Sequence, residues 1–578
     1  MPRLLPRCLA PVLRHVRERY PDVFVASIID DTNFLCRDPT RASAAIRMFS
    51  EEMAKLGVDT VVRKTFVTAS DNVDLSGGVA GATVAPTGVP FVGVPVGPER
   101  AADSFAASFI SKRLANSIAQ LHRLPLLNDP QLAVYLLTTT FAHRGRFLAT
   151  LVPGAWGGRP AAGQAILDYA RELRAAADAC HSRPLPARAF ASISEGGIGL
   201  RLIDSPAEHA FVFLSCHLRV LTTLRKHQPA LATALLSATG PQSFPGRVAA
   251  ARAALPLSLQ SPSCTPACPA LFNLDDHKAQ AATAARRKAL QAWRREATMS
   301  ALSGAAKLAF LLATSAGALG GLFLGLYSST REHLFSAADW SSAVLSYLGE
   351  VPPGLERLAS DDDPLAGSTL ATASKEKNGT HDGIRDALHS SALRAGLRSE
   401  KEAVGHFPPV GSEVPVDGDA HKGALRRIDN EVSDTSTGEL WLADVTTPVA
   451  LTAARIRDWS AGGPADKHVT EKVGSKTRKY ADKPDGATLV PFVVGMFGET
   501  NKEALSLLGT LGRKAAEKAN ISDPLAAKHF AGAFTFTAKR EISLALARGK
   551  VAQFELARRK LGRPHEGAAP QAQDSNSV

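Results

Sequence analysis

Two adjacent carboxylates near the start of the chain have the setting that metal-dependent phosphoryl transfer needs. Asp30 and Asp31 separate two short apolar runs within VFVASIIDDTNFLC, residues 23–36. Runs of this kind on both sides of an acidic pair predict two strands joined by a tight turn. Carboxylates on a rigid hairpin can bind Mg²⁺, which prefers oxygen ligands and activates phosphate groups. The alternative is an ordinary hairpin, because Asp also favours turns through hydrogen bonds to its own backbone.

A second group of acidic and basic side chains lies near the C-terminus. The segments LRRIDNEV (425–432) and LWLADVTTP (440–448) predict two strands with a turn between them, which would bring Asp429 and Asp444 onto neighbouring strands. A lysine-rich stretch with Lys476 and Lys479 follows. Two carboxylates can hold a metal at a scissile phosphate, while a lysine positions the attacking water and stabilises developing charge. A surface hairpin with ordinary acids is the alternative.

Regular elements must position these groups. After the first hairpin, Asp38 and Pro39 predict the start of a helix that ends at Gly57, and residues 58–62 predict a strand directly before Lys64. A second apolar hairpin is predicted at 88–97, GVPFVGVPVG. Near the C-terminus, a helix is predicted to begin at His381 and Asp382, with Ile384, Leu388, Ala392 and Ala395 on one face, before the two acidic strands. A buried strand at 489–497 and two helices follow the lysines.

The succession of hairpin, helix, strand, lysine and hairpin resembles the palm of reverse transcriptases from non-LTR retrotransposons. In this resemblance IIDD is the catalytic box and GVPFVGVPVG is the primer-grip hairpin, while SEGGIGL (194–200) matches a glycine element downstream of the thumb. The resemblance implies that Asp30 and Asp31 bind Mg²⁺ and that Lys64 assists near the nucleotide. A third carboxylate, the fingers and the nucleotide-binding loop would lie before residue 1. We therefore expect an N-terminally truncated fragment that is inactive as a polymerase.

The C-terminal segment resembles the restriction-like endonuclease of site-specific non-LTR retrotransposon polyproteins. RRID, DVT and KTRKY correspond to its acidic and lysine boxes, and Glu402 corresponds to its upstream glutamate. The resemblance implies catalytic roles for Asp429, Asp444, Lys476 and Lys479, and metal binding by Asp429, Asp444 and Glu402. Ile428 stands where the family has proline. Residues 351–380 contain no cysteine or histidine, so we expect no zinc there.

The charge balance favours a polyanionic partner. The 578 residues carry a net charge of +12, and six cysteines in so long a chain do not form a disulfide framework, which favours an intracellular protein. The resemblance implies an RNA template, a DNA target and a nuclear location. Candidate contacts to nucleic acid fall on two predicted helices, although both basic groups could equally be solvated helix surface. They are Arg144 and Arg146 on the first, and Arg286, Arg287, Lys288, Arg294 and Arg295 around Trp293 on the second.

One uncharged segment could be either a buried part of a soluble protein or a membrane span. Residues 308–327 are long enough to cross a membrane, but four glycines and several small polar residues dilute their hydrophobicity. We expect a buried segment broken by glycine and no stable membrane association, with a single membrane span as the alternative.

The predicted fold class is α+β, with a partial polymerase palm, a helical thumb, a helical connector and a C-terminal α/β restriction-like nuclease domain. The predicted function is that of a retrotransposon RNA-directed DNA polymerase fragment, a nucleotidyltransferase by resemblance, with an appended Mg²⁺-dependent DNA endonuclease. A catalytically dead nucleic-acid-binding remnant is the alternative. The predicted segments are 1–104 (palm), 105–205 (thumb), 206–350 (connector), 351–380 (linker), 381–550 (nuclease) and 551–578 (disordered tail).

Overall fold

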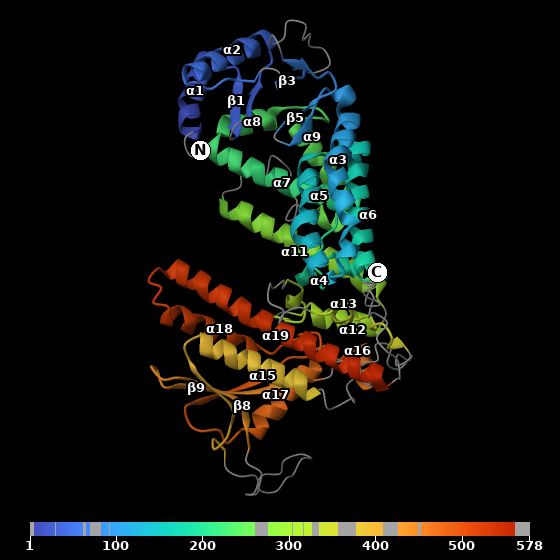
Figure 1. Ribbon diagram of the computed structural model, residues 1–578, viewed down its shortest axis with the longest axis vertical. Helices are drawn as coiled ribbons and strands as arrows, with labels where there is room; N and C mark the ends of the chain where they lie inside the picture. The colour runs from blue at the N-terminus through green and yellow to red at the C-terminus, as the bar shows by residue number, and fades with distance from the viewer. Residues whose placement is uncertain are drawn as a thin grey trace, which may run out of the picture. The chain divides into compact units, whose positions relative to one another are not determined.

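The chain folds as a mixed α+β protein in which helices predominate and the sheets are small (Figure 1). The computed structural model describes residues 5–28, 31–61, 65–69, 82–91, 93–260, 276–302, 304–315, 317–325, 335–356, 377–407, 426–448 and 452–560. Two compact units are present. The first contains Met1–His122, Thr140–Ala175 and Leu202–Trp293, and the second contains Arg123–Thr139, Ala176–Arg201 and Arg294–Val578. The predicted palm segment thus lies in the first unit and the predicted nuclease segment in the second.

The N-terminal hairpin and its helix form as the sequence predicts. Helix α1 (Leu5–Arg19) precedes strands β1 (Phe24–Ile28) and β2 (Asp31–Leu35), which pair antiparallel, and helix α2 (Pro39–Lys55) follows. Asp38 caps α2 by accepting a hydrogen bond from the backbone N–H of Thr40 at 2.8 Å. Apolar side chains from these elements form a small core that includes Val16, Val25 and Phe49.

The strand predicted at 58–62 is wrong in its described part. Residues 58–61 have no strand structure, and residues 62–64, including Lys64, lie outside the described residues. The backbone N–H of Val58 donates to Met53 O at 3.1 Å, and the Thr60 hydroxyl donates to Ser50 Oγ at 2.8 Å. The segment therefore turns back onto α2 instead of joining a sheet.

The palm sheet expected for residues 1–104 is likewise not formed by the described strands. β3 (Phe66–Val67) pairs with β4 (Thr83–Val84), and β5 (Val89–Phe91) pairs with β6 (Val94–Val96), the latter as the predicted second hairpin. These pairs and the β1–β2 pair are three separate two-stranded sheets among the described residues. No described strand extends the β1–β2 ladder.

Helices make up the rest of the first unit. Phe213 and Leu214 of α7, Val248 of α9 and Leu290 of α11 share one core, against which Trp293 packs. The helices are α3 (Glu99–Leu121), α5 (Ala142–Leu151), α6 (Pro160–Cys180, whose end belongs to the second unit), α7 (Pro206–His227), α8 (Pro229–Ser237), α9 (Phe244–Ala253) and α11 (Asp276–Ala301), with short helices η4 (Ala155–Gly157) and η7 (Leu257–Leu259).

The second unit begins with short helices and one glycine-rich segment. The segment 308–327 is largely buried in its described part, in agreement with the prediction: Leu308 is 2% and Phe323 is 1% exposed. Its glycines allow the backbone near Gly498 to approach closely, and the N–H of Leu319 donates to Gly498 O at 2.8 Å. The elements are η2 (Leu124–Leu127), α4 (Pro130–Leu136), η3 (Leu137–Phe141), η5 (Ala187–Phe190), η6 (Ile193–Glu195), α12 (Gly304–Ala313), η8 (Leu322–Gly325) and α13 (Ala337–Tyr347). None of the helices in the described ranges has both the length and the apolar character of a membrane span.

A four-stranded mixed sheet lies at the centre of the C-terminal part of the second unit. Its order is β10-β9-β8-β7, with β7 (Arg398–Ala403), β8 (Ile428–Asp434) and β9 (Glu439–Thr446) antiparallel and β10 (Ala487–Val493) parallel to β9. The sheet therefore forms from the two predicted acidic strands, the predicted buried strand and one unpredicted strand, β7.

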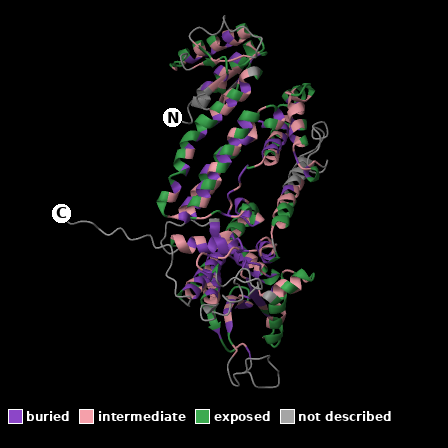
Figure 2. Ribbon diagram, turned by 90° about the vertical axis from the view of Figure 1, so that its right-hand side faces the viewer, coloured by how far each residue is buried: buried purple, intermediate pink, exposed green. Residues whose placement is uncertain are grey.

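Helices cover both faces of this sheet, and buried residues are concentrated between the layers (Figure 2). On one face Trp441 and Val445 pack against helices α15, α18 and α19, where Ile384, Leu388 and Ala392 of α15 are fully buried as predicted. The helices are α15 (Lys377–Arg394), α16 (Ala453–Ser460), α17 (Lys467–Lys479), α18 (Lys502–Lys518) and α19 (Pro524–Lys560).

The prediction of a disordered tail from residue 551 sets the start of that tail too early. Helix α19 continues to Lys560, because Phe554 and Ala557 are buried against Leu355. Residues 561–578 lie outside the described residues.

Candidate active site

The two C-terminal acids that the sequence singled out lie on adjacent strands of the mixed sheet. Asn430 of β8 pairs with Ala443 of β9 at the end of the ladder between these strands, and Asp429 and Asp444 are the next residues along each strand. The backbone N–H of Val445 donates to Oδ2 of Asp429, so the Asp429 carboxylate lies against the residue that follows Asp444. The fold therefore brings these two carboxylates to one place.

Asp444 is a buried carboxylate with two partners from helix α17 and its C-terminal end. It is 4% exposed. The hydroxyl of Tyr480 donates to Oδ1 at 2.9 Å, and the Lys476 ammonium forms an ion pair with Oδ2. Both partners stabilise the ionised carboxylate, because an unpaired charge at this depth would be costly.

Asp429 is held by a neighbouring strand and by helix α15. Its Oδ2 atom accepts a hydrogen bond from the backbone N–H of Val445 at 2.6 Å and lies 3.1 Å from Nε2 of His381. The hydrogen bond to Asp429 raises the pKa of His381. Both contacts use Oδ2, so Oδ1 has no hydrogen-bond partner among the described residues.

Lys479 and Tyr480 have perturbed acid–base properties at this site. Desolvation lowers the pKa of Lys479, an effect that Lys476 reinforces and that Asp444 and Asp429 oppose. The Lys479 ammonium lies 4.8 Å from the centre of the Tyr480 ring. Burial, followed by the charge of Asp444, raises the pKa of Tyr480. Lys479 and Tyr480 are thus both electrostatically coupled to Asp444 and Asp429.

Glu402, the third predicted metal ligand of this segment, forms ion pairs with two arginines. Its carboxylate pairs with Arg385 at 2.6 Å and with Arg427 at 3.5 Å. Metal binding by Glu402 stays a prediction. Glu402 does have a left-handed backbone, with φ of 55°, which is uncommon for a residue other than glycine and is often found near functional sites.

Two residues of the site received no role from the sequence. Tyr480 stands inside the KTRKY segment, and its contact with Asp444 follows only from the way α17 packs on the sheet. His381 lies 48 residues before Asp429 in the chain, and only the packing of α15 brings the two side chains together. Tertiary contacts of this kind leave no local sequence pattern.

The predicted polymerase residues have little structural description. Asp30 and Lys64 lie outside the described residues, and Asp31 is described only by its backbone, as the first residue of β2. The register pairs Ile28 with Asp31, so Asp31 begins the second strand of the hairpin. No side-chain geometry for polymerase chemistry follows from this.

The basic residues proposed for nucleic-acid contact have mixed outcomes. Arg294 pairs with the buried Glu195 at 3.4 Å, so it serves the interior of the second unit instead of an open surface. Arg144 donates to Ser117 Oγ, and its guanidinium lies 5.6 Å from the centre of the Phe141 ring. The remaining residues are on the expected helices, Arg146 on α5 and Arg286, Arg287, Lys288 and Arg295 on α11, and this placement alone does not test the prediction.

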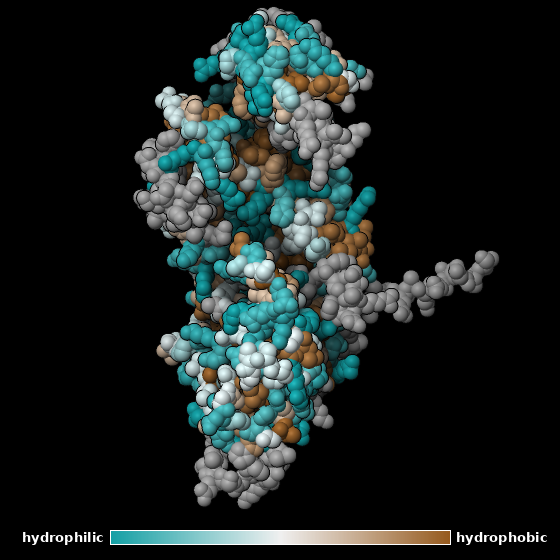
Figure 3. Space-filling model, turned by 90° about the vertical axis from the view of Figure 1, so that its left-hand side faces the viewer, coloured by the Kyte–Doolittle hydropathy of each residue, from teal (hydrophilic) through white to brown (hydrophobic). Residues whose placement is uncertain are grey.

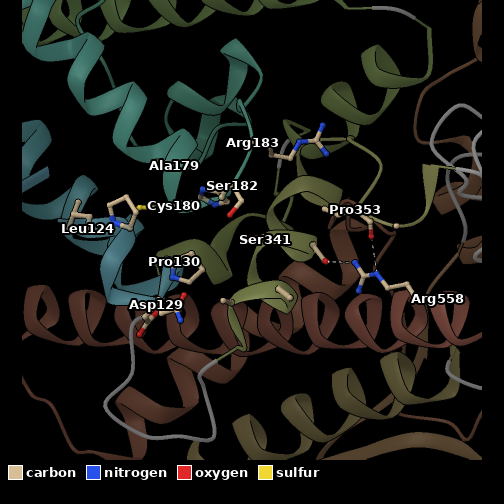
Figure 4. A pocket seen from close by; sticks show the side chains of 17 residues that line it. Leu124, Asp129, Pro130, Ala179, Cys180, Ser182, Arg183, Ser341, Pro353 and Arg558 are labelled. Atoms are coloured by element: carbon tan, nitrogen blue, oxygen red, sulfur yellow. Dashed lines mark hydrogen bonds between the residues drawn. The ribbon is translucent and has the colours of Figure 1, made fainter. Parts of the chain in front are cut away.

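A cavity of about 330 Å³ in the second unit contains none of the predicted residues (Figure 4). Asp129 in its wall caps helix α4, and Arg558 donates to Pro353 O at 3.0 Å and to Ser342 Oγ at 2.8 Å. Asp129 and Arg558 thus already serve structural roles. His181 differs from them, because its buried Nε2 atom has no partner among the described residues.

Comparison with models of known protein families and with curated proteins yields no match for this chain.

Proposed function

We propose that the C-terminal part of the second unit is a metal-dependent DNA endonuclease of the restriction-like kind that accompanies non-LTR reverse transcriptases. The observation that carries the proposal is the placement of Asp429 and Asp444 on the paired strands β8 and β9, where both act electrostatically on Lys479 and Tyr480 and Lys476 is bound to Asp444. The element order also supports it: a helix precedes the strands with the two acids, and a helix with the lysines follows them.

The carboxylates fit the requirements of Mg²⁺. This cation often binds one or two protein carboxylates and completes its shell with water and substrate phosphate. Asp429 and Asp444 would supply these carboxylates, and water and substrate phosphate would complete the shell. When bound, Mg²⁺ would polarise the scissile phosphate and lower the pKa of a bound water.

The surrounding side chains have separable roles in this proposal. Tyr480 and the backbone N–H of Val445 fix the orientation of the two carboxylates through hydrogen bonds. Lys476 holds positive charge beside Asp444 and is placed to stabilise negative charge on a phosphate. Desolvation lowers the pKa of Lys479, so its neutral form, which can accept a proton, is more accessible than that of an ordinary lysine.

Nicking of supercoiled DNA by the full chain in Mg²⁺ tests the proposal. We expect Asp444→Asn and Asp429→Asn each to lower the nicking rate by at least about 100-fold. Glu400→Gln is the matched control, because Glu400 is an exposed acid on β7 of the same sheet. Retention of the wild-type rate by Asp444→Asn, or absence of Mg²⁺-dependent nicking by the wild type, would overturn the proposal.

A nucleic-acid-binding protein without catalysis is the second candidate. The pairing of Asp444 with Lys476 favours it, because an ammonium on Oδ2 competes with a cation for that atom. This candidate predicts DNA or RNA binding that weakens steeply with salt, as expected for a chain with a net charge of +12, and no Mg²⁺-dependent nicking.

For the first unit we propose, from the sequence resemblance, an origin in a reverse-transcriptase palm, with RNA as the ancestral template. The two hairpins and the intervening α2 support this order of elements. The proposal predicts no primer extension by the chain above the level of an Asp30→Ala variant. Extension that Asp30→Ala abolishes would show an intact polymerase instead.

A further inference from the structure

We propose that the outward surface of the first half of helix α19 binds single-stranded DNA. The surface, called the α19 stripe below, contains side chains at helical spacing i, i+4, i+8, i+11 and i+15. They are Leu525, His529, Ala533, Phe536 and Arg540.

The opposite side of this helix provides the packing that the fold requires. Ala538 is 1% exposed, and the Thr535 hydroxyl donates to Leu508 O of α18 at 3.3 Å. Gly512 of α18 packs so closely on Ala531 that a Cβ atom there would lie 2.5 Å from Ala531 O. The α19 stripe is therefore not needed to hold α19 in place.

Large apolar side chains are nevertheless exposed on and beside the stripe. Leu525 is 62%, Phe536 is 51% and the nearby Phe530 is 42% exposed. Hydrophobic residues on the face of the molecule drawn in Figure 3 form small separate patches in a mostly hydrophilic surface. Phe536 lies on the stripe and Phe530 lies beside it, about 120° around the helix, and both rings are open to a binding partner.

The charges around these rings fit a polyanion. Residues 524–540 contain Lys528, Lys539 and Arg540 and no acidic residue. The Arg540 guanidinium lies 5.7 Å from the centre of the Phe536 ring. Nucleobases stack on exposed aromatic rings while neighbouring cations contact the phosphates, and this combination is typical of single-strand binding.

The acids at the two ends of the stripe are engaged in local contacts. Asp523 accepts hydrogen bonds from the backbone N–H groups of Leu525 and Ala526 at 3.2 Å each. Glu541 forms an ion pair with Arg394 of α15. A second copy of the chain is a poorer occupant than DNA, because it would bring Lys528, Lys539 and Arg540 of two α19 helices together.

The choice of DNA over RNA rests on the proposed endonuclease function, since cleaved or opened target DNA supplies single strands. Binding to the stripe does not itself require catalysis. The two proposals can therefore fail independently.

Fluorescence anisotropy with an oligothymidine of about 20 nucleotides, without Mg²⁺, tests the inference on the full chain. We expect the double variant Phe530→Ala/Phe536→Ala to bind at least about 10-fold more weakly, because stacking of each base contributes substantially. Phe147→Ala is the matched control: Phe147 is 45% exposed but lies on α5 of the first unit. The charge reversal Lys528→Glu/Lys539→Glu should also reduce the salt dependence of binding.

Three results would overturn the inference. They are binding by the phenylalanine double variant within twofold of wild type, tighter binding of oligouridine than of oligothymidine, and a wild-type dimer that the double variant dissociates. Asp444→Asn separates the two proposals: it should bind oligothymidine as the wild type does while losing nicking. Loss of oligothymidine binding in Asp444→Asn would contradict the assignment of binding to the stripe.

Discussion

Asp444 carries its charge in an interior position, and its partners explain how this is tolerated. Its side chain is 5% exposed, and Lys476, at 19%, is the one cation paired with it among the described side chains. The Tyr480 hydroxyl supplies the second interaction. Burying a charge is costly unless it is paired and hydrogen-bonded, so stability and the proposed chemistry depend on the same contacts.

Removal of the Lys476 charge should therefore destabilise the fold, because the buried Asp444 carboxylate would lose its ion-pair partner. We expect Lys476→Met to lower the free energy of unfolding by about 3 kcal/mol, because Asp444 would keep an uncompensated charge. The double variant Lys476→Met/Asp444→Asn should recover most of this loss. Urea unfolding measures both, and equal losses in the single and double variants would show that the pair is not the cause.

The contact of His381 with Asp429 predicts a pH dependence of stability. The folded pKa of His381 is raised above the unfolded value of about 6.5, so its contribution is fully present below that pH and is lost as the pH rises through the folded pKa. The variant His381→Gln keeps an N–H donor but cannot titrate. Urea unfolding from about pH 5 to about pH 9 should show that the free energy of unfolding of the wild type exceeds that of His381→Gln most at low pH. A difference that does not vary with pH would contradict the assignment.

At the scale of elements, local pattern predicted the segments whose own residues dictate their structure. The Asp38 cap of α2, the buried stripe of α15 and the apolar β10 are all confirmed. Strand β7 was missed because RSEKEA has no alternation of apolar and polar residues, and only its pairing with β8 makes it a strand. Charged residues are common on such edge strands.

Glycine pairs in the second unit show the same dependence on tertiary contact. Gly498 has φ of +84° and lies against Gly320, so a side chain there meets both a strained backbone and a neighbouring chain segment. We expect Gly498→Ala to lower the free energy of unfolding by more than about 2 kcal/mol. Gly462→Ala is the control, because Gly462 also has positive φ, +95°, but open space around it.

Thermal unfolding of the two glycine variants separates the two causes. A much lower midpoint for Gly498→Ala than for Gly462→Ala would identify the close approach as the main cost. Equal midpoints would mean that backbone strain alone accounts for the loss.

At the scale of the whole molecule, the chain contributes alternating segments to two compact units. The segments predicted at 105–205 and 206–350 do not coincide with these units, since each segment contributes residues to both. Composition along the chain reports local changes, whereas membership of a unit depends on contacts between distant segments. The proposed metal site lies entirely in the second unit.

Metal binding should consequently act on one unit. Calorimetry of the full chain should show that Mg²⁺ raises the unfolding temperature of the second unit. The stabilisation should be about 2.7 kcal/mol when the Mg²⁺ concentration is about 100 times its Kd. Any separate transition of the first unit should stay unchanged. Asp429→Asn/Asp444→Asn should abolish the shift. An equal shift in this double variant would place metal binding elsewhere.

The central claim, that Asp429 and Asp444 together hold a divalent cation, is tested most directly by titration of the full chain with Mn²⁺ followed by electron paramagnetic resonance. The account predicts a bound Mn²⁺ that is displaced by Mg²⁺ and lost in Asp429→Asn/Asp444→Asn, with Glu400→Gln unchanged. Undiminished Mn²⁺ binding by the double variant would contradict it.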